Sequence, residues 1–165
     1  MDIPFITQQN NGVYNDCGPA CVAMLAAWLG RSPVVKDIAA QIDTAQDGTT
    51  GPDLGRGIGL QGLTPVYVSG ALPAVRVYPF IQLVWYPSLP AKAPGYEKYA
   101  DYHWIVRLDD FRYHDPLFPD NKGAVIVSNG INSPPKSSMP PAQTAPPAPP
   151  WQPCPQSAHP TWGAS

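Results

Sequence analysis

The sequence predicts an α+β fold in which N-terminal helices pack on a C-terminal antiparallel sheet. Apolar residues recur at helical spacing over the first 60 residues, and short strand-like runs follow them. Helices and strands that are separated along the chain, rather than alternating, are typical of the α+β class. A composition of 44% hydrophobic and 13% charged residues indicates a globular chain, and 165 residues suffice for one domain with a core.

The first helix is predicted from Cys17 to about Leu29. Asp16 precedes it as a possible N-cap, Pro19 falls in its first turn, and Gly30 ends it. Its apolar residues fall at i, i+4, i+7, i+8 and i+11, which predicts one buried face. These residues are Cys17, Cys21, Met24, Leu25 and Trp28.

Two further helices and five strands are expected. The second helix follows Ser32-Pro33, and a third begins after Thr50. Runs of strand-forming residues come next, at 66–69, 80–86, 103–108, 111–115 and 124–128. The third helix contains a GxGxxG pattern, Gly57 to Gly62, but it follows a turn-rich stretch rather than a strand. We therefore interpret its glycines as packing positions and not as a nucleotide-binding loop.

The composition changes abruptly after Asn132. Residues 133–165 hold eleven of the 23 prolines and one charged residue, Lys136. Proline removes backbone donors and fixes φ, so this segment favours extended polyproline conformations. We expect one folded domain over 1–132 and a disordered tail over 133–165. Trp151 and Trp162 leave open that the tail docks on a protein partner.

Charge and hydropathy exclude several function classes. A net charge of −2 and scattered Lys and Arg leave no basic surface, so nucleic acid is not an expected partner. No run is long and apolar enough for a membrane span, and the N-terminus does not resemble a secretory signal. Three cysteines, two of them four residues apart, indicate reduced thiols. A cytoplasmic location is therefore the default expectation.

Cys17 is the candidate nucleophile. A thiol attacks as its thiolate, and the N–H groups and dipole of a helix start stabilise that anion. The adjacent Gly18 lets the backbone approach a substrate, and the Cys17 N–H can donate to an oxyanion. A second donor is expected from a side-chain amide a few residues upstream, where Gln8, Gln9, Asn10 and Asn11 all lie.

His103 and Asp115 are the candidate base and its orienting group. His103 begins an apolar strand, and the next strand ends in His114-Asp115-Pro116. A two-residue turn at 109–110 would place Asp115 on the wrong face, whereas a three-residue turn at 108–110 would place it opposite His103. We therefore predict an odd-length turn or a bulge between the strands.

Two alternatives concern the other histidine. The same alternation of faces along the hairpin makes His114 point away from Cys17 whenever His103 points toward it. This disfavours His114 as the base. A zinc site formed by Cys17, Cys21, His103 and His114 is a second alternative, but one helical CxxxC pair is weak evidence for zinc. We expect no metal and no cofactor.

The chain resembles the C39-like branch of the papain-like cysteine peptidases. The similarity is carried by residues 4–8, by the run from Asn15 to Leu25, by the strand 80–85, and by residues 103–106 and 114–117. The resemblance implies a papain-like fold, a Cys17–His103–Asp115 triad, no cofactor, and Gln8 in the oxyanion hole. In the bacteriocin-processing members the glutamine stands six residues before the cysteine, where this chain has Asn11.

The expected function is that of a cysteine peptidase or related thiol acyl-transfer hydrolase. Its substrate would be a peptide or protein, cleaved at a peptide, amide or isopeptide bond through an acyl-enzyme. The alternative is a catalytically silent papain-like binding or structural module with a proline-rich docking tail.

Overall fold

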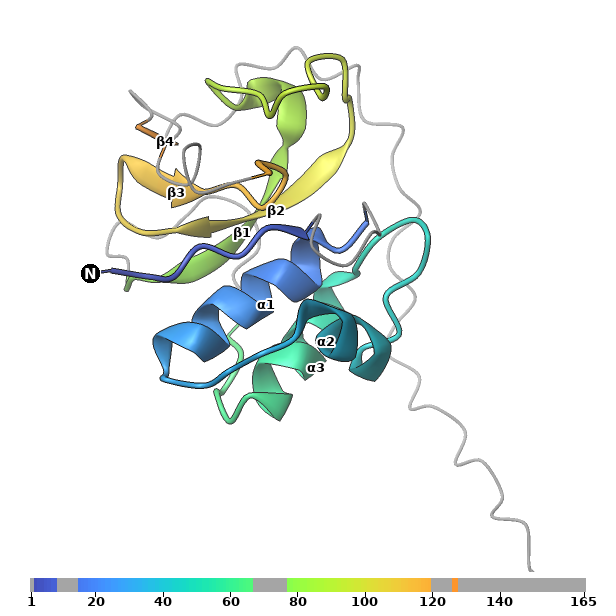
Figure 1. The fold of residues 1–165 in the computed structure, drawn as a ribbon, viewed down its shortest axis with the longest axis vertical. Helices are drawn as coiled ribbons and strands as arrows, with labels where there is room; N and C mark the ends of the chain where they lie inside the picture. Colours follow the sequence, from blue (N-terminus) through green and yellow to red (C-terminus); the bar gives the residue numbers. More distant parts are fainter. Residues whose placement is uncertain (1, 9–14, 67–76, 120–125, 128–165) are drawn as a thin grey trace, which may run out of the picture. The chain divides into compact units, whose positions relative to one another are not determined.

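The computed structural model describes residues 2–8, 15–66, 77–119 and 126–127, all of which belong to the unit Met1–Pro134. Three helices precede a four-stranded antiparallel sheet, as the sequence predicts (Figure 1). The strands follow one another in the order β1-β2-β3-β4. The elements are α1 Cys17–Trp28, α2 Val35–Gln41, α3 Gly51–Leu60, β1 Phe80–Trp85, β2 Tyr102–Arg107, β3 Arg112–His114 and β4 Ile126–Val127.

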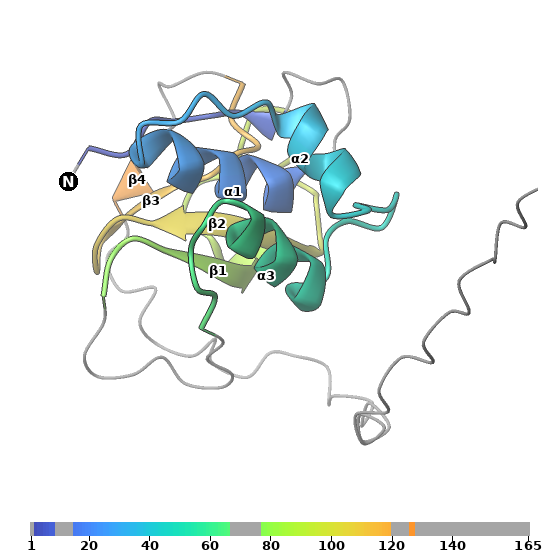
Figure 2. The same cartoon turned by 90° about the horizontal axis from the view of Figure 1, so that it is seen from below.

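The expected single buried face of α1 is wrong, because the helix is buried on all sides. Every residue from Cys17 to Ala26 is buried, whereas Trp28, at the end of the expected stripe, is 37% exposed. The sheet lies on one side of α1, and α2 and α3 lie on the other (Figures 1 and 2). A helix between two layers has no solvent face, so its apolar residues need not follow one stripe.

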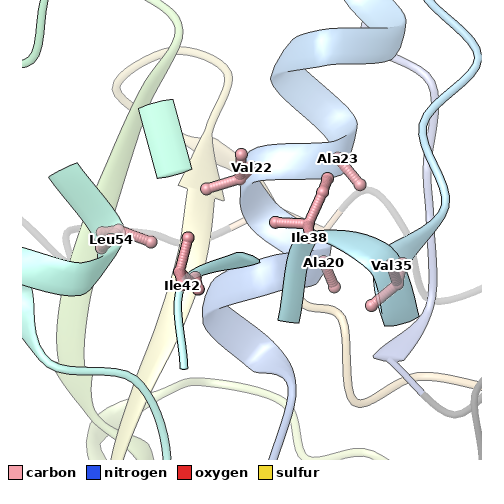
Figure 3. Packing of buried hydrophobic residues seen from close by; sticks show 7 residues of the cluster. All are labelled: Ala20, Val22, Ala23, Val35, Ile38, Ile42 and Leu54. Carbon is pink, nitrogen blue, oxygen red and sulfur yellow. The ribbon is translucent and has the colours of Figure 1, made fainter. Parts of the chain in front are cut away.

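Two hydrophobic clusters account for the burial of α1. One joins α1 to the other helices, as Figure 3 shows. It consists of Ala20, Val22, Ala23, Val35, Ile38, Ile42 and Leu54. The second joins α1 to the N-terminal segment and to β2 and the residue that follows it. It consists of Ile3, Cys21, Met24, Leu25, Val106 and Leu108. Removal of this apolar surface from water is the main force that holds the helices to the sheet.

The helix ends follow local sequence signals in part. Thr50 Oγ1 accepts a hydrogen bond from Asp53 N at 3.3 Å, as an N-cap of α3 should. After α1, Gly30 adopts a φ of 78° and its N–H donates to Ala27 O, which confirms it as the helix stop. Asp16 occupies the N-cap position of α1, but its side chain makes no capping hydrogen bond.

The GxGxxG pattern falls within and just after α3, where one of its glycines has a packing role. A Cβ on Gly57 would lie 3.2 Å from Ile42 Cγ2 and 3.4 Å from Val22 Cγ2, so the missing side chain lets α3 approach α1. The same addition at Gly59 would meet nothing within 4 Å. This supports the packing interpretation for Gly57 alone.

The described strands match four of the five expected runs. Three parts of the prediction lie outside the described residues. They are most of the run at 66–69, the outer residues of the run at 124–128, and the whole tail from 133. The division of the chain at Asn132 therefore stays a prediction. In the part of the chain that the structure describes, no helix combines the length and hydropathy needed to cross a membrane.

Candidate active site

Cys17 is the first residue of α1 and is 9% exposed. The helix begins there because Ala20 N donates to Asp16 O at 2.9 Å, which closes the first turn. Cys17 lines a cleft of about 350 Å³ together with Gln8 and His103. The structure thus brings three of the four predicted site residues to one cleft.

His103 and Asp115 are held together in the interior. His103 Nε2 lies 2.8 Å from Asp115 Oδ1, and both side chains are at least 98% buried. The same carboxylate oxygen accepts a hydrogen bond from Leu117 N at 2.9 Å. Because Asp115 fixes Nε2, the imidazole is left with Nδ1 to face the thiol.

The β2–β3 turn confirms the predicted odd length. Val106 pairs with His114, and Leu108 N donates to Arg112 O at 3.0 Å, which leaves a three-residue turn, Asp109 to Phe111. The expected turn at 108–110 was one residue too early. Asp109 explains the shift, because its Oδ1 accepts from the N–H groups of both Phe111 and Arg112 and stabilises the turn there.

This register changes how the aspartate reaches the histidine. Continued beyond β3, it places His103 opposite Leu117, with Asp115 on the same face two residues away. The pair therefore meets diagonally rather than directly across the ladder. That His103 and Asp115 share one face of the hairpin could be predicted from the sequence. Their diagonal contact could not.

The pKa of His103 reflects these partners. Burial acts to lower it, but hydrogen bonds to Asp115 and to Cys17 and the negative charges nearby outweigh burial and raise the pKa of His103 to about 9. The imidazole thus favours its protonated form at neutral pH. An imidazolium beside a cysteine stabilises the thiolate.

The second thiol of α1 is of a different kind. Cys21 is fully buried, and burial together with the charges of Cys17 and Asp115 raises its pKa well above the ordinary value. Both described cysteines are free. Cys21 therefore serves as an apolar core residue, as expected, and is not a competing nucleophile.

His114 lies on the other face of the hairpin and contacts the N-terminal segment. Its Nε2 lies 2.8 Å from Ile3 O, and its ring packs against Phe5 with centroids 5.6 Å apart. The two histidines therefore do not converge on Cys17. Among the described residues no group of three or more His, Cys, Asp or Glu side chains is arranged to hold a metal ion.

Gln8 reaches the cleft from the N-terminal segment. It is 1% exposed, and its N–H donates to Pro116 O at 2.9 Å, while Thr7 Oγ1 donates to the same carbonyl at 3.1 Å. The segment is thus tied to the residue that follows Asp115. Gln9, Asn10 and Asn11 lie outside the described residues, so the choice among the amides stays a prediction.

The loop from Asp47 to Gly51 forms one wall of the cleft, which the sequence did not reveal. A Cβ on Gly18 would lie 2.6 Å from Thr49 Cβ, so this glycine is needed for Thr49 to pack against the start of α1. Thr49 O also accepts from Trp104 Nε1 at 2.9 Å. The contact with Thr49 is thus a second reason for a glycine at this position, and its role in substrate approach stays a prediction.

Tyr86, which follows β1 directly, packs against His103, a contact that the sequence did not predict. Its fully buried ring meets the His103 ring edge to face, with centroids 5.2 Å apart and an interplanar angle of 89°. Its hydroxyl accepts from Ala93 N at 2.8 Å, and its N–H donates to Asp101 O at 2.9 Å. In the sequence it was only the last residue of the expected strand 80–86.

Comparison with known families bears on the N-terminal part of the chain. Residues 2–64 match the Peptidase C39 family. The N-terminal part of the chain is C39-like. The C39-like match contains Gln8 and Cys17 and ends before His103 and Asp115, and it supports assignment to a family of cysteine peptidases. The α+β arrangement is consistent with the papain-like fold of such enzymes. No curated protein and no solved structure matches the chain.

Proposed function

We propose that this C39-like protein is a cysteine peptidase, or a related thiol acyl-transfer hydrolase, that uses Cys17, His103 and Asp115. One observation carries the proposal: a buried histidine is hydrogen-bonded to a buried aspartate and lines one cleft with a cysteine at a helix start, which also contributes to the raised pKa of the histidine. A nucleophile, a base and a group that orients the base are the parts that covalent acyl transfer needs.

Acylation would begin from the Cys17 thiolate and the His103 imidazolium. The sulfur bonds to the carbonyl carbon of the substrate and drives the carbonyl electrons onto oxygen. When the tetrahedral intermediate collapses, the carbon–nitrogen bond breaks and His103 gives its proton to the leaving amine. A thioester on Cys17 and neutral His103 remain.

Deacylation would reverse these roles. Neutral His103 takes a proton from water as the water oxygen bonds to the thioester carbon, and the carbon–sulfur bond then breaks. The products are a carboxylic acid, the Cys17 thiolate and protonated His103. Asp115 would keep the imidazole oriented and stabilise its positive charge throughout.

The developing oxyanion needs preorganised donors. The backbone N–H of Cys17 at the start of α1 and the side-chain amide of Gln8 would supply them. The location of both residues in the lining of one cleft, and the tie between Gln8 N and Pro116 O, support this assignment. The proposed substrate is a peptide or protein.

Site-specific thiol labelling tests the proposal. Full-length protein is treated with iodoacetamide at about pH 6, and the alkylation rates of Cys17, Cys21 and Cys154 are followed by peptide mass spectrometry. We expect Cys17 to react at least tenfold faster than the other two, and His103→Ala to remove that advantage.

A uniform slow reaction of all three thiols would reject the enzyme and favour the silent papain-like module. Hydrolysis of a peptide or ester by wild-type protein but not by Cys17→Ser separates a peptidase from a merely reactive thiol. A protein partner for the tail and a cytoplasmic location rest on composition alone and remain predictions.

A further inference from the structure

Large apolar side chains are exposed where β1 ends and β2 begins. Leu83 is 47%, Trp85 40% and Tyr102 51% exposed, and we call these three residues the apolar strip. Trp85 pairs with Tyr102 across the ladder, and their rings pack edge to face with centroids 5.4 Å apart. Since alternate strand residues share a face, Leu83 lies on the same face as the pair.

The same face of the sheet is covered farther along. Ile81 and Val106, which pair with each other, pack in the cluster that α1 closes. Trp104, opposite Leu83, is partly buried and its ring N–H donates to Thr49 O. The sheet face is thus protected by α1 at one end and exposed at the strip. Grouped exposed apolar surface commonly marks a binding site.

The strip continues into the cleft that holds Cys17. Leu83 and Tyr102 line this cleft with the nucleophile, and Tyr99, 36% exposed, lies beside them. The loop Asp47–Gly51, whose residues are small and polar, also lines the cleft. The cleft lining therefore combines exposed apolar side chains with small polar residues and the reacting sulfur.

The charges of the cleft also disfavour an acidic substrate. Asp47 and Asp101 belong to its lining, and no described lysine or arginine does. An acidic substrate side chain would meet like charge there, whereas an apolar side chain could cover the exposed strip.

We propose that the apolar strip binds a bulky apolar side chain, preferably aromatic, of an extended peptide substrate next to the bond that is cleaved. This inference rests on the proposed cysteine peptidase function, because it names the substrate class for that cleft. Offset and edge-to-face ring contacts with Trp85 and Tyr102 would favour phenylalanine over alanine.

Peptidyl acyloxymethyl ketones test the site, since they alkylate the nucleophile only after the peptide binds. Three reagents carry Phe, Ala or Asp at the two positions before the reactive carbonyl. We expect the second-order rate at Cys17 to be about tenfold higher for Phe than for Ala, with Asp the slowest. Iodoacetamide, which has no peptide, reports the nucleophile by itself.

Single-residue variants then test whether the preference for Phe depends on the apolar strip. Tyr102→Ser and Leu83→Ser should each lower the Phe rate severalfold relative to the iodoacetamide rate of the same variant. Phe111→Ser is the matched control, because Phe111 is similarly exposed at 57% but lies in the β2–β3 turn outside the cleft lining. It should leave the Phe preference unchanged.

Equal rates for the three peptide reagents would overturn the inference, as would an equal loss in Phe111→Ser. Variants that lose the iodoacetamide rate in the same proportion as the Phe rate would also overturn it, since the strip would then only support the nucleophile. If Cys17 has no special reactivity, the proposed function fails. Calorimetric binding of the unreactive Phe and Asp peptide amides would still test whether the apolar strip binds an aromatic side chain. Equal affinities for the two peptides would reject the inference.

Discussion

His103 Nε2 lies 2.8 Å from Asp115 Oδ1, although the two residues are not directly opposite in the β2–β3 hairpin. Their contact is diagonal, and the turn Asp109–Phe111 sets it. The fully buried carboxylate and imidazole stabilise each other's charge in a place that water does not reach. Most of the expected chemistry of the site depends on this pair.

Asp115→Asn should reduce the alkylation rate of Cys17 and move the basic limb of its pH profile to lower pH. The negative partner raises the pKa of His103, so a neutral amide lets that pKa fall from about 9 toward 6.5. We expect peptide or ester turnover to fall about a hundredfold. Stopped-flow pH profiles measure both effects. Asp37→Asn, an exposed acid in α2, is the control, and an unshifted basic limb in Asp115→Asn would contradict the prediction.

The free energy of unfolding should fall as the pH rises from neutral to above 9. The pKa of His103 is higher in the folded state than its ordinary value of 6.5, so the folded protein binds the proton more tightly. This stabilisation is fully present below about pH 6.5 and is lost as the pH passes about 9. The shift corresponds to about 3 kcal/mol at most.

Urea unfolding at pH 6, 7.5 and 9.5 measures this dependence. His103→Gln should flatten the slope over this range, because the group with the raised pKa is gone. A slope that persists in His103→Gln would assign the pH dependence to other residues.

Tyr86→Leu should lower the pKa of His103, because loss of the ring opens the His103–Asp115 pair to water and weakens their interaction. We also expect a loss of about 2 kcal/mol in stability. Tyr86→Phe keeps the ring and should keep the pH profile, at a cost of about 1 kcal/mol for the lost hydrogen bond from Ala93 N.

Tyr113→Leu is the control for Tyr86→Leu. Tyr113 and Tyr86 are both fully buried and belong to one hydrophobic cluster, but among the described residues no ring contact joins Tyr113 to His103. It should lower stability without moving the pH profile. Equal shifts of the pH profile in Tyr86→Leu and Tyr113→Leu would show that Tyr86 acts only through general packing.

Gly18→Ala should destabilise the protein by about 1 to 3 kcal/mol. The added Cβ would lie 2.6 Å from both Thr49 Cβ and Oγ1, so the loop must move away from the start of α1. Thr49→Gly in the same chain should restore part of the loss. Gly59→Ala is the matched helical control and should be neutral or stabilising by about 0.5 kcal/mol, because a Cβ there meets nothing within 4 Å. Thermal denaturation compares the wild type, Gly18→Ala, the double variant and Gly59→Ala.

Gln8→Ala should slow acylation about a hundredfold while leaving the iodoacetamide rate near that of the wild type. Only acyl transfer develops an oxyanion, so only that reaction needs the second donor. The burst with p-nitrophenyl acetate measures acylation, and Gln41→Ala, an exposed glutamine in α2, is the control. An unchanged burst would exclude Gln8 as the donor.

The helix and strand boundaries near the site could be predicted from the sequence because local signals set them. Asp16 and Gly30 bracket α1, Thr50 caps α3, and His103 begins an apolar run. Cys17 at a helix start is likewise a local property. These features depend on residues only a few positions apart, which the sequence displays side by side.

Where the sequence alone misled, a distant element had changed the environment. The apolar stripe of α1 predicted one buried face, but α2 and α3 cover the opposite side. Gly18 was predicted to let a substrate approach, and the sequence did not indicate its packing role, because Thr49, which occupies the space beside it, is 31 positions away.

By itself the sequence determined the order of helices and strands, the helix-start cysteine and the parity that puts Asp115 on the face of His103. The tertiary structure alone decided the diagonal His103–Asp115 contact, the ring of Tyr86 against the imidazole and the exposure of the apolar strip. The physical reason is that helix caps and strand periodicity arise from neighbouring residues. Burial, charge and exposure instead depend on which distant surfaces the fold brings together.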